Sequence, residues 1–131
     1  MNDIINSVKE FNKAFKLPLR DKPQLIEKDE YKLQYELLKE EVCEYLQACK
    51  DNDIIGVADS LGDILYILIG SCIRHGLHDK IHGIFDEIHR SNMTKLVNGK
   101  PIYNESGKVL KSKNYEVPNL YPIIFPEKNI D

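Results

Sequence analysis

Acidic side chains gather in one short stretch of the sequence, and their spacing follows the turn of an α-helix. Glu36, Glu40 and Glu44 recur every four residues, with Glu41 beside them. At about 100° per residue, these carboxylates fall on neighbouring turns of one helix face. Such a face either stays in solvent as an ordinary acidic surface or holds a divalent cation through its oxygens. Both interpretations remain open for this stretch alone.

Two further carboxylates lie within the most apolar stretch of the chain. Asp59 and Asp63 are the only charged residues between positions 54 and 73, and their spacing of four puts both on one helix face. Burying two unpaired carboxylates would cost several kcal/mol each, so they are exposed, paired with a lysine, or bound to a cation. Small residues on the same face leave space beside them: Gly56, Ser60 and Gly70.

Taken together, the two acidic groups predict four to six carboxylates facing one another across a pair of helices, with no histidine among them. Oxygen ligands of this kind suit Mg²⁺, with Mn²⁺ as a substitute, rather than zinc. In proteins Mg²⁺ is usually held by a few carboxylates and by phosphate oxygens of the substrate. The acidic residues therefore favour a metal-assisted reaction on a phosphorylated small molecule.

A basic segment follows the acidic part of the chain and is the natural partner for phosphate groups. Five lysines and one glutamate lie between Ser91 and Tyr115, a local net charge of +4 that leaves −7 for the rest of the molecule. A lysine-rich tail on a small protein is also a common solubilising segment, and the residues alone leave both roles open. The candidate phosphate donors are Arg90, Lys95, Lys100, Lys108, Lys111 and Lys113.

The periodicity of apolar residues predicts four helices that position these groups. They are expected over residues 3–16, 29–51, 54–74 and 79–93. The second carries its acidic residues opposite an apolar stripe that includes Tyr31, Tyr35 and Val42. The third is apolar almost all round, which predicts a central, buried helix. Residues 51–53 break the chain between these two helices and supply a cap for the third.

The end of the chain is expected to be irregular. Asn-Gly and Ser-Gly turn signals between residues 98 and 107 predict one small hairpin, and three prolines follow it. We therefore expect an all-α fold, a bundle of four to five helices with an irregular basic C-terminal tail. It forms a single domain over residues 1–131, with a helical body over 1–96 and a phosphate-binding tail over 97–131.

Composition excludes several classes of protein. A chain of 131 residues that is 42% hydrophobic and 30% charged has the make-up of one folded domain. Its net charge of −3 argues against a dedicated nucleic-acid binder. Three cysteines without a C-x-x-C pair predict free thiols in a cytoplasmic protein. Aspartates interrupt the one stretch apolar enough to suggest a membrane span, so no membrane segment is expected.

Two segments of the chain resemble the all-α nucleoside triphosphate pyrophosphohydrolase superfamily, which includes MazG-type enzymes, dimeric dUTPases and phosphoribosyl-ATP pyrophosphohydrolase. The first pairs E-E-V-C-E at residues 40–44 with A-D-S-L-G-D-I-L-Y at 58–66. The second, F-D-E-I-H-R-S-N-M-T-K-L at 85–96 with the lysine-rich segment after it, is similar to the tail of the phosphoribosyl-ATP pyrophosphohydrolase-like branch. Together the matches cover about residues 31–120.

The resemblance implies a helical bundle that dimerises and a Mg²⁺-dependent hydrolysis of a nucleotide between its α and β phosphates. The products are then a monophosphate and pyrophosphate. Carried over by position, Glu41, Glu44 and Asp63 are implied metal ligands. Glu40 is implied to be a further ligand or the base that orients the attacking water.

The second motif departs from the usual E-x-x-D pattern of these enzymes. Ser60 stands three residues before Asp63, and the acid, Asp59, stands four before it. Asp59 remains on the same helix face, so it is kept as a metal ligand, while its role and the number of metal ions stay open. The residues expected to bind substrate are Arg90, Asn92, Lys95, Lys108, Lys111 and Tyr115.

The function expected from these observations is the Mg²⁺-dependent cleavage of a nucleoside triphosphate, in the service of nucleotide-pool house-cleaning. A phosphoribosyl-ATP pyrophosphohydrolase of histidine biosynthesis is one alternative, and a non-catalytic helical interaction module is the other. We also expect at least a homodimer, because a helix that is apolar almost all round has few neighbours among four short helices.

Overall fold

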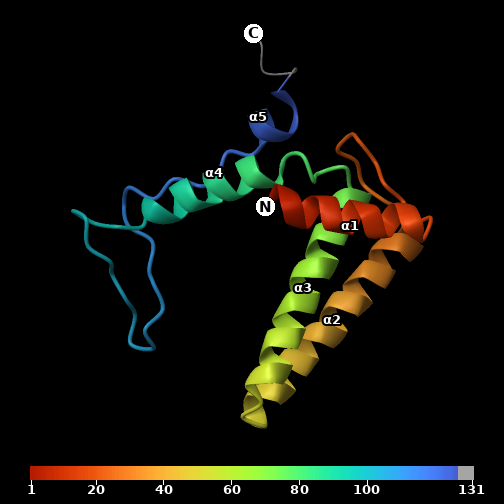
Figure 1. Cartoon of the computed structure of the whole chain (residues 1–131). Helices are drawn as coiled ribbons and strands as arrows, with labels where there is room; N and C mark the ends of the chain where they lie inside the picture. Colours follow the sequence, from red (N-terminus) through yellow and green to blue (C-terminus); the bar gives the residue numbers. More distant parts are fainter. Residues whose placement is uncertain (127–131) are drawn as a thin grey trace. The chain divides into compact units, whose positions relative to one another are not determined.

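The computed structural model describes residues 1–126, which form five helices and no extended strand (Figure 1). The helices are α1 (Asn2–Ala14), α2 (Lys28–Lys50), α3 (Ile54–Arg74), α4 (Ile81–Met93) and α5 (Tyr121–Ile124). The first four agree with the predicted segments to within two residues at each end. The predicted all-α fold class is therefore confirmed, and α5 is one short turn within the tail.

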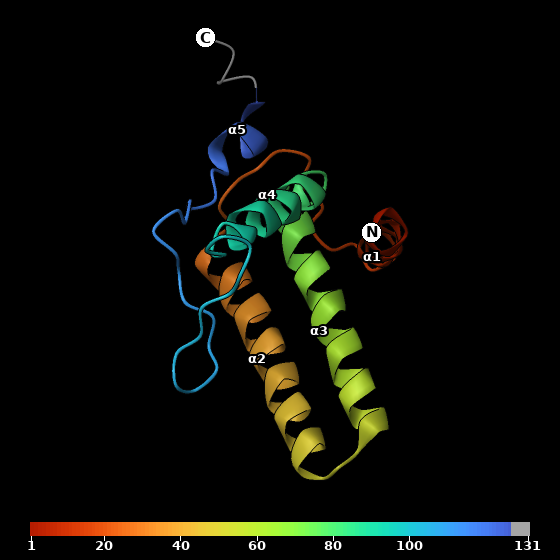
Figure 2. The same cartoon turned by 90° about the vertical axis from the view of Figure 1, so that its left-hand side faces the viewer.

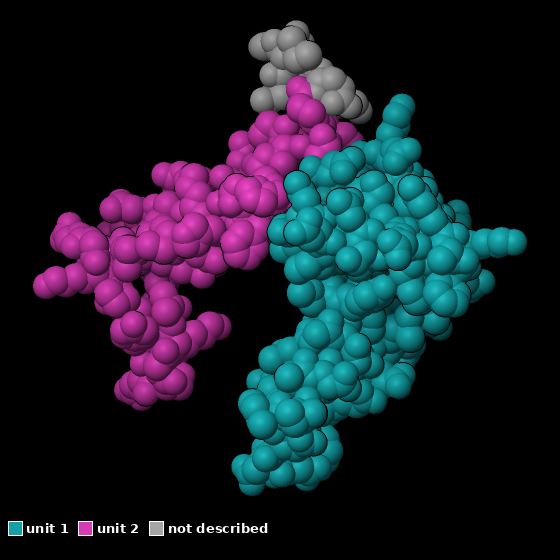
Figure 3. All heavy atoms as spheres, in the orientation of Figure 1, with its two compact units in different colours: residues 1–79 teal, residues 80–131 magenta. Residues whose placement is uncertain are grey.

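The chain divides into two compact units, Met1–Asp79 and Lys80–Asp131 (Figure 3). The first contains α1, α2 and α3, and the second contains α4, α5 and the loops between them. The division falls just before α4, whereas the boundary expected from the sequence between body and tail lies between residues 96 and 97. The acidic residues of interest all lie in the first unit and the basic segment lies in the second.

α2 and α3 form an antiparallel hairpin closed by residues 51–53 (Figure 2). Asn52 has a left-handed backbone conformation, with φ of 54°, which asparagine adopts more readily than most residues. The Asp53 carboxylate then accepts a hydrogen bond from the Gly56 backbone N–H at 3.0 Å, so it caps α3 as predicted. This short turn keeps α2 and α3 in contact along the hairpin.

α1 packs on α3 through a narrow apolar face (Figure 1). Ile5 and Val8 are buried in this contact, together with the polar side chain of Asn12. The ring of Phe11 meets the ring of Tyr66 edge to face, with 5.6 Å between centroids, an arrangement that aromatic pairs prefer. α1 is therefore a third helix packed beside the α2–α3 hairpin.

The connector over residues 15–27 closes the C-terminal end of α3. Its backbone N–H groups at Arg20 and Gln24 donate to the carbonyl oxygens of Ile73 and His75, at 3.2 and 2.9 Å. These bonds satisfy carbonyl groups that the end of a helix leaves unpaired. Gly76 turns the chain with φ of 70°, in close contact with the connector, where an L side chain would be strained.

A cluster of three charged side chains fastens this connector and the start of α2 to the end of α3. Glu30 pairs with Arg20 at 2.8 Å and with Arg74 at 3.1 Å, and Arg20 also donates to the Arg74 carbonyl oxygen at 2.7 Å. The Arg20 hydrogen bond is the main reason that the pKa of Glu30 is lowered. The cluster holds α2 and α3 at a defined register along the hairpin.

The single chain buries the expected central helix over residues 54–74 only in part. Apart from Ser60, the buried residues of α3 lie in its C-terminal third, where Ile69 and Ile73 are 1% and 0% exposed. Towards its start, Ile54 and Ile55 are 74% and 76% exposed. The reason is that α3 packs on only two helices of its unit, α1 and α2, which leaves much of its apolar surface uncovered.

α3 is also long and apolar enough, by length and composition alone, to cross a membrane. The mean hydropathy of its most apolar window is 1.6, and 11% of that window is buried. Core helices of soluble proteins pass the same test, so the property is weak evidence for a membrane span. Asp59 and Asp63 lie within the helix, and charges at such depth are rare in membrane spans.

In the second unit, the tail returns to the C-terminal half of α4 and is fastened there by hydrogen bonds. The Ser91 hydroxyl donates to the Glu116 carbonyl oxygen at 2.6 Å, and the Glu116 N–H donates to the Thr94 hydroxyl at 2.9 Å. The Ser112 hydroxyl donates to the Thr94 carbonyl oxygen at 2.7 Å. The loop over residues 97–111 lies between Thr94 and Ser112, which this last hydrogen bond joins.

The predicted small hairpin is present in this loop. Antiparallel bridges join Val97 to Lys100 and Tyr103 to Val109. The side chain of Asn104 accepts hydrogen bonds from the backbone N–H groups of residues 106 and 108, the local bonding that favours asparagine in turns. The hairpin therefore projects from α4 with most of its side chains exposed.

Candidate functional site

The structure brings four of the predicted carboxylates together between α2 and α3. Glu40, Glu41 and Glu44 lie on α2 and Asp63 lies on α3. The other three carboxylates raise the pKa of Glu41 by their negative charge, and Glu44 also raises it by a hydrogen bond. The predicted acidic cluster thus exists in the folded chain and is centred on Glu41.

Glu41 is the residue whose environment is most unusual. Its Oε2 atom is buried and has no hydrogen-bond partner. Burial is the main reason that its pKa is raised to about 7, and the hydrogen bond and negative charge of Glu44 add to this effect. A carboxyl group that titrates near neutral pH because of burial and like charges is typical of functional sites.

Glu41 lies on the face of α2 that packs toward α3, which differs from the expected arrangement. The apolar periodicity predicts that the acidic residues lie opposite a packed stripe that includes Tyr31 and Tyr35. In the structure these tyrosines are 49% and 58% exposed. The face turned inward is instead a narrow seam on α2: Gln34, Leu38, Glu41 and Ala48. The seam is narrow because α3 is the main neighbour of α2.

The remaining acidic candidates lie at the edge of this cluster. Asp59 is exposed and is not among the groups that shift the pKa of Glu41. Ser60, which occupies the position of the usual motif acid, is 4% exposed. Glu36 is exposed on α2. Asp63 is therefore the carboxylate of α3 that the structure places beside Glu41.

The donor atoms in the cluster suit a divalent cation that prefers oxygen ligands, such as Mg²⁺ or Mn²⁺. A cation would partner the orphaned Oε2 atom of Glu41 and offset the repulsion among its acidic neighbours. Within residues 1–126, no three His, Cys, Asp or Glu side chains are already drawn into ligand geometry. Binding would thus require side-chain rotation at Glu44 and Asp63.

Three of the predicted substrate-binding residues meet in the second unit. The Nζ atoms of Lys95 and Lys111 lie 5.9 and 4.9 Å from the centroid of the Tyr115 ring, within the range of cation–π attraction. A cavity of about 370 Å³ adjoins them, lined in part by Lys111 and Lys113. Tyr115 therefore gathers two ammonium groups that the sequence places sixteen residues apart.

Arg90, in contrast, already has two carboxylate partners within its unit. Its guanidinium lies 2.8 Å from Glu87 and 2.9 Å from Glu116. The Arg90 hydrogen bonds are the main reason that the pKa of Glu87 is lowered to about 2, and the pKa of Arg90 itself is raised by Glu87. The side chain of Arg90 thus fastens the tail to α4. Asn92 and Lys108 are exposed on α4 and on the hairpin.

Several residues that stabilise this unit could not be predicted from the sequence. Ser91 is 0% exposed and, with Thr94, holds the returning tail by the hydrogen bonds described above. The Glu87–Arg90 pair has the i, i+3 spacing of a helix ion pair, so this one contact could have been predicted from the sequence. The partnership of Arg90 with Glu116 spans twenty-six residues and leaves no local signal.

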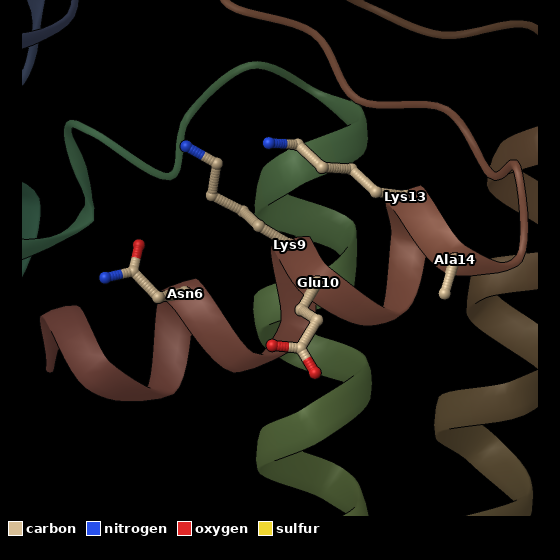
Figure 4. Close-up of a pocket in the computed structure, with 5 residues that line it drawn as sticks. All are labelled: Asn6, Lys9, Glu10, Lys13 and Ala14. Atoms are coloured by element: carbon tan, nitrogen blue, oxygen red, sulfur yellow. The ribbon is translucent and has the colours of Figure 1, made fainter.

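A wide, open hollow lies on the exposed face of α1 (Figure 4). Its volume is about 590 Å³, and Lys9, Lys13 and Glu10 are among its lining residues. In the close-up, the two lysines extend to one side of the helix and the glutamate to the other (Figure 4). All of the lining residues come from this single helix, and none belongs to the predicted site.

Comparison with known proteins identifies the family. The family model for phosphoribosyl-ATP pyrophosphohydrolase matches residues 8–92, a span that includes the acidic cluster on α2 and α3. The chain is also 30% identical to an uncharacterized protein of Acanthamoeba polyphaga mimivirus, over 99% of its own length. It spans 59% of the length of that viral relative.

The family match and the observed structure agree on the same elements. The matched span begins within α1 and ends within α4, so it contains the hairpin that carries Glu40, Glu41, Glu44 and Asp63. The fold within that span is all-helical, as the resemblance implies. The chain belongs to the phosphoribosyl-ATP pyrophosphohydrolase family.

Proposed function

We propose that this chain hydrolyses a nucleoside triphosphate, or a related nucleotide, between its α and β phosphates in the presence of Mg²⁺. The products are the nucleoside monophosphate and pyrophosphate. The observation that carries the proposal is the buried, unpartnered carboxylate oxygen of Glu41 among three further carboxylates. Membership of a family described as a pyrophosphohydrolase supports it.

The carboxylates divide into two roles in the proposed site. Glu41, Glu44 and Asp63 would hold the cation, and Asp59 is kept as a further ligand. When bound, Mg²⁺ would acidify a water molecule and offset charge on the departing pyrophosphate. Glu40 lies at the exposed edge of the cluster, where it can orient a water molecule and accept its proton.

The proposed reaction is an in-line displacement at the α-phosphorus. The water oxygen forms a bond to phosphorus while the bond from phosphorus to the α–β bridging oxygen breaks. The bridging oxygen leaves with the pyrophosphate, and Glu40 takes the proton that the water releases. No covalent intermediate with the chain is needed, so positioning and charge stabilisation supply the catalysis.

The basic segment of the second unit supplies the proposed contacts to phosphate. Lys95 and Lys111 flank Tyr115, and Lys108 and Asn92 are exposed and free to bind a ligand. These groups place positive charge and hydrogen-bond donors on substrate oxygens. Arg90 acts on this segment indirectly, because it fastens the tail to α4.

The exposed apolar surface of the first unit supports a homodimer. Tyr31, Tyr35 and Val42 on α2 and Ile54 and Ile55 on α3 are all between 48% and 76% exposed. Large exposed apolar patches mark interaction sites in soluble proteins. A second copy of the chain that covers these apolar residues would give an interface of the obligate kind, commonly ~2,000 Å² or more.

The release of pyrophosphate by purified variants tests the proposed function. Glu41→Gln, Glu44→Gln and Asp63→Asn are expected to abolish Mg²⁺-dependent turnover while the fold survives. Glu36→Gln is the matched control, because Glu36 lies exposed on the same helix and is not among the groups acting on Glu41. Wild-type rates in the first three variants would show that the site is elsewhere.

A further inference from the structure

A small pocket lies in the first unit where α1, α2 and α3 meet. Its volume is about 110 Å³. The wall is mainly apolar, with a few polar side chains, which is the usual make-up of a small-molecule site. Each helix contributes to it: Phe11 and Asn12 from α1, Gln34 and Leu37 from α2, and Tyr66 and Gly70 from α3.

The pocket lies on the same helix faces as the carboxylate cluster. Gln34 precedes Glu41 by seven residues on α2, and Gly70 follows Asp63 by seven residues on α3. A separation of seven residues is close to two full helical turns, so each pair shares a face. Because α2 and α3 are antiparallel, both pairs extend in the same direction along the hairpin. The pocket begins about 5–6 Å along the helices from the carboxylates, at Tyr66 and Leu37, and reaches Gln34 and Gly70 at about 11 Å.

Two amide side chains give this pocket unused hydrogen-bonding capacity. The Gln34 side-chain nitrogen donates to the Ser71 hydroxyl at 3.0 Å, and the Asn12 side-chain nitrogen donates to the Pro18 carbonyl oxygen at 3.1 Å. These bonds fix the orientation of both amides. Among residues 1–126, neither amide oxygen has a protein partner. Each oxygen is therefore an acceptor left for a ligand that carries N–H groups.

We propose that this pocket takes the base of the substrate nucleotide and that it selects a single-ring pyrimidine over a purine. The inference rests on the proposed function, because the carboxylates must hold the phosphates for the base to reach the pocket. The edge-to-face pair of Phe11 and Tyr66 gives a planar base an apolar wall. The pocket of about 110 Å³ opens to solvent and is closer in size to one planar ring than to a fused pair of rings, so a purine would leave more of its surface in water.

Gly70 allows the pocket to be filled without disturbing its walls. A Cβ atom at this position would lie 3.9 Å from Val8 Cγ1 and 4.0 Å from Gln34 Nε2, both ordinary contacts. Alanine also favours a helix interior over glycine, so Gly70→Ala is expected to fold. Gly62→Ala is the matched control, because it lies on the same helix and its Cβ would meet nothing within 4 Å.

Steady-state kinetics with pyrimidine and purine nucleoside triphosphates test the pocket. The wild type is expected to have the lower KM for pyrimidines. Gly70→Ala is expected to raise that KM about tenfold or more, the usual effect of one methyl group in a fitted site, with little change in kcat. Gly62→Ala is expected to behave as the wild type. Neither variant should melt below the wild type.

Two results would overturn the pocket assignment while leaving pyrophosphate release intact: equal KM values for all bases in the wild type, or an unchanged KM in Gly70→Ala. If no nucleotide is hydrolysed, the proposed function fails, and calorimetric titration with CMP, UMP and AMP decides on the pocket. Pyrimidine binding that Gly70→Ala weakens would support it. An absence of pyrimidine-selective binding would overturn it.

Discussion

Replacing Glu41 by glutamine is expected to stabilise the metal-free protein in a pH-dependent way. The pKa of Glu41 is raised from an ordinary value of 4.5 to about 7 in the folded chain, so the folded state binds this proton more tightly than the unfolded state. Wild-type stability therefore falls as pH rises from about 4.5 to about 7. Above pH 7 the buried charge opposes folding in full, and Glu41→Gln removes it.

The size of the effect follows from the same shift. One pKa unit corresponds to about 1.4 kcal/mol, so the change from 4.5 to about 7 corresponds to an upper bound of ~3.5 kcal/mol. Glu41 is half-buried rather than sealed from water, and solvent screening reduces the expected gain to ~1–2 kcal/mol. At pH 4.5 the difference between the variant and the wild type should shrink toward zero.

Urea unfolding in the presence of EDTA, at pH 4.5 and pH 8, measures this difference. Glu36→Gln serves as the control, because Glu36 is exposed on the same helix, and its effect should not depend on pH. Adding millimolar Mg²⁺ at pH 8 should raise the melting temperature of the wild type by mass action and leave that of Glu41→Gln almost unchanged. A variant less stable than the wild type at pH 8, or a gain of equal size at both pH values, would refute the reasoning.

Three further predictions concern the parts that support the site. Glu30→Gln leaves two guanidinium groups without their carboxylate. The variant should lose ~2–3 kcal/mol of unfolding free energy, measured by urea unfolding near pH 7. Because the pKa of Glu30 is lowered in the folded state, the wild type should lose the same contribution as pH falls below about 4.5. The double variant Lys108→Ala, Lys111→Ala should raise KM or lower kcat for the nucleotide in steady-state assays, whereas the control double variant Lys9→Ala, Lys13→Ala should change neither much. Equal, small effects in both double variants would favour a solubilising tail. Sedimentation at micromolar concentrations should give at least twice the 15.2 kDa chain mass, and a monomer that persists as concentration rises would contradict the proposed dimer.

The helices could be predicted from the sequence because their apolar residues follow the helical period, and the start of α3 also carries a local signal. Residues 51–53 combine a left-handed Asn52 with the Asp53 cap, and both residue types are typical of such positions. Burial could not be predicted in the same way. Periodicity shows which residues of α3 are apolar, but not what covers them, and in the single chain Ile54 and Ile55 remain exposed.

The acidic cluster could be predicted from spacing, whereas its centre could not. Glu36, Glu40, Glu41 and Glu44 look alike in the sequence, and the packing of α2 on α3 alone makes Glu41 the buried member with an orphaned oxygen. The role of Arg90 was also beyond sequence reasoning. Its second carboxylate partner comes from the returning tail, so its engagement depends on tertiary structure.

The identity of the reaction products tests the central proposal most directly. Phosphorus NMR of a nucleotide panel incubated with the purified protein and Mg²⁺ separates cleavage between the α and β phosphates from cleavage at the terminal phosphate. The panel should hold ribo- and deoxyribonucleoside triphosphates together with phosphoribosyl-ATP. We predict a monophosphate and pyrophosphate in equal amounts, no reaction in EDTA, and no reaction with Glu41→Gln. Release of orthophosphate and a diphosphate would contradict the proposed cleavage between the α and β phosphates. No turnover of any nucleotide would contradict the proposed activity and favour a non-catalytic helical module.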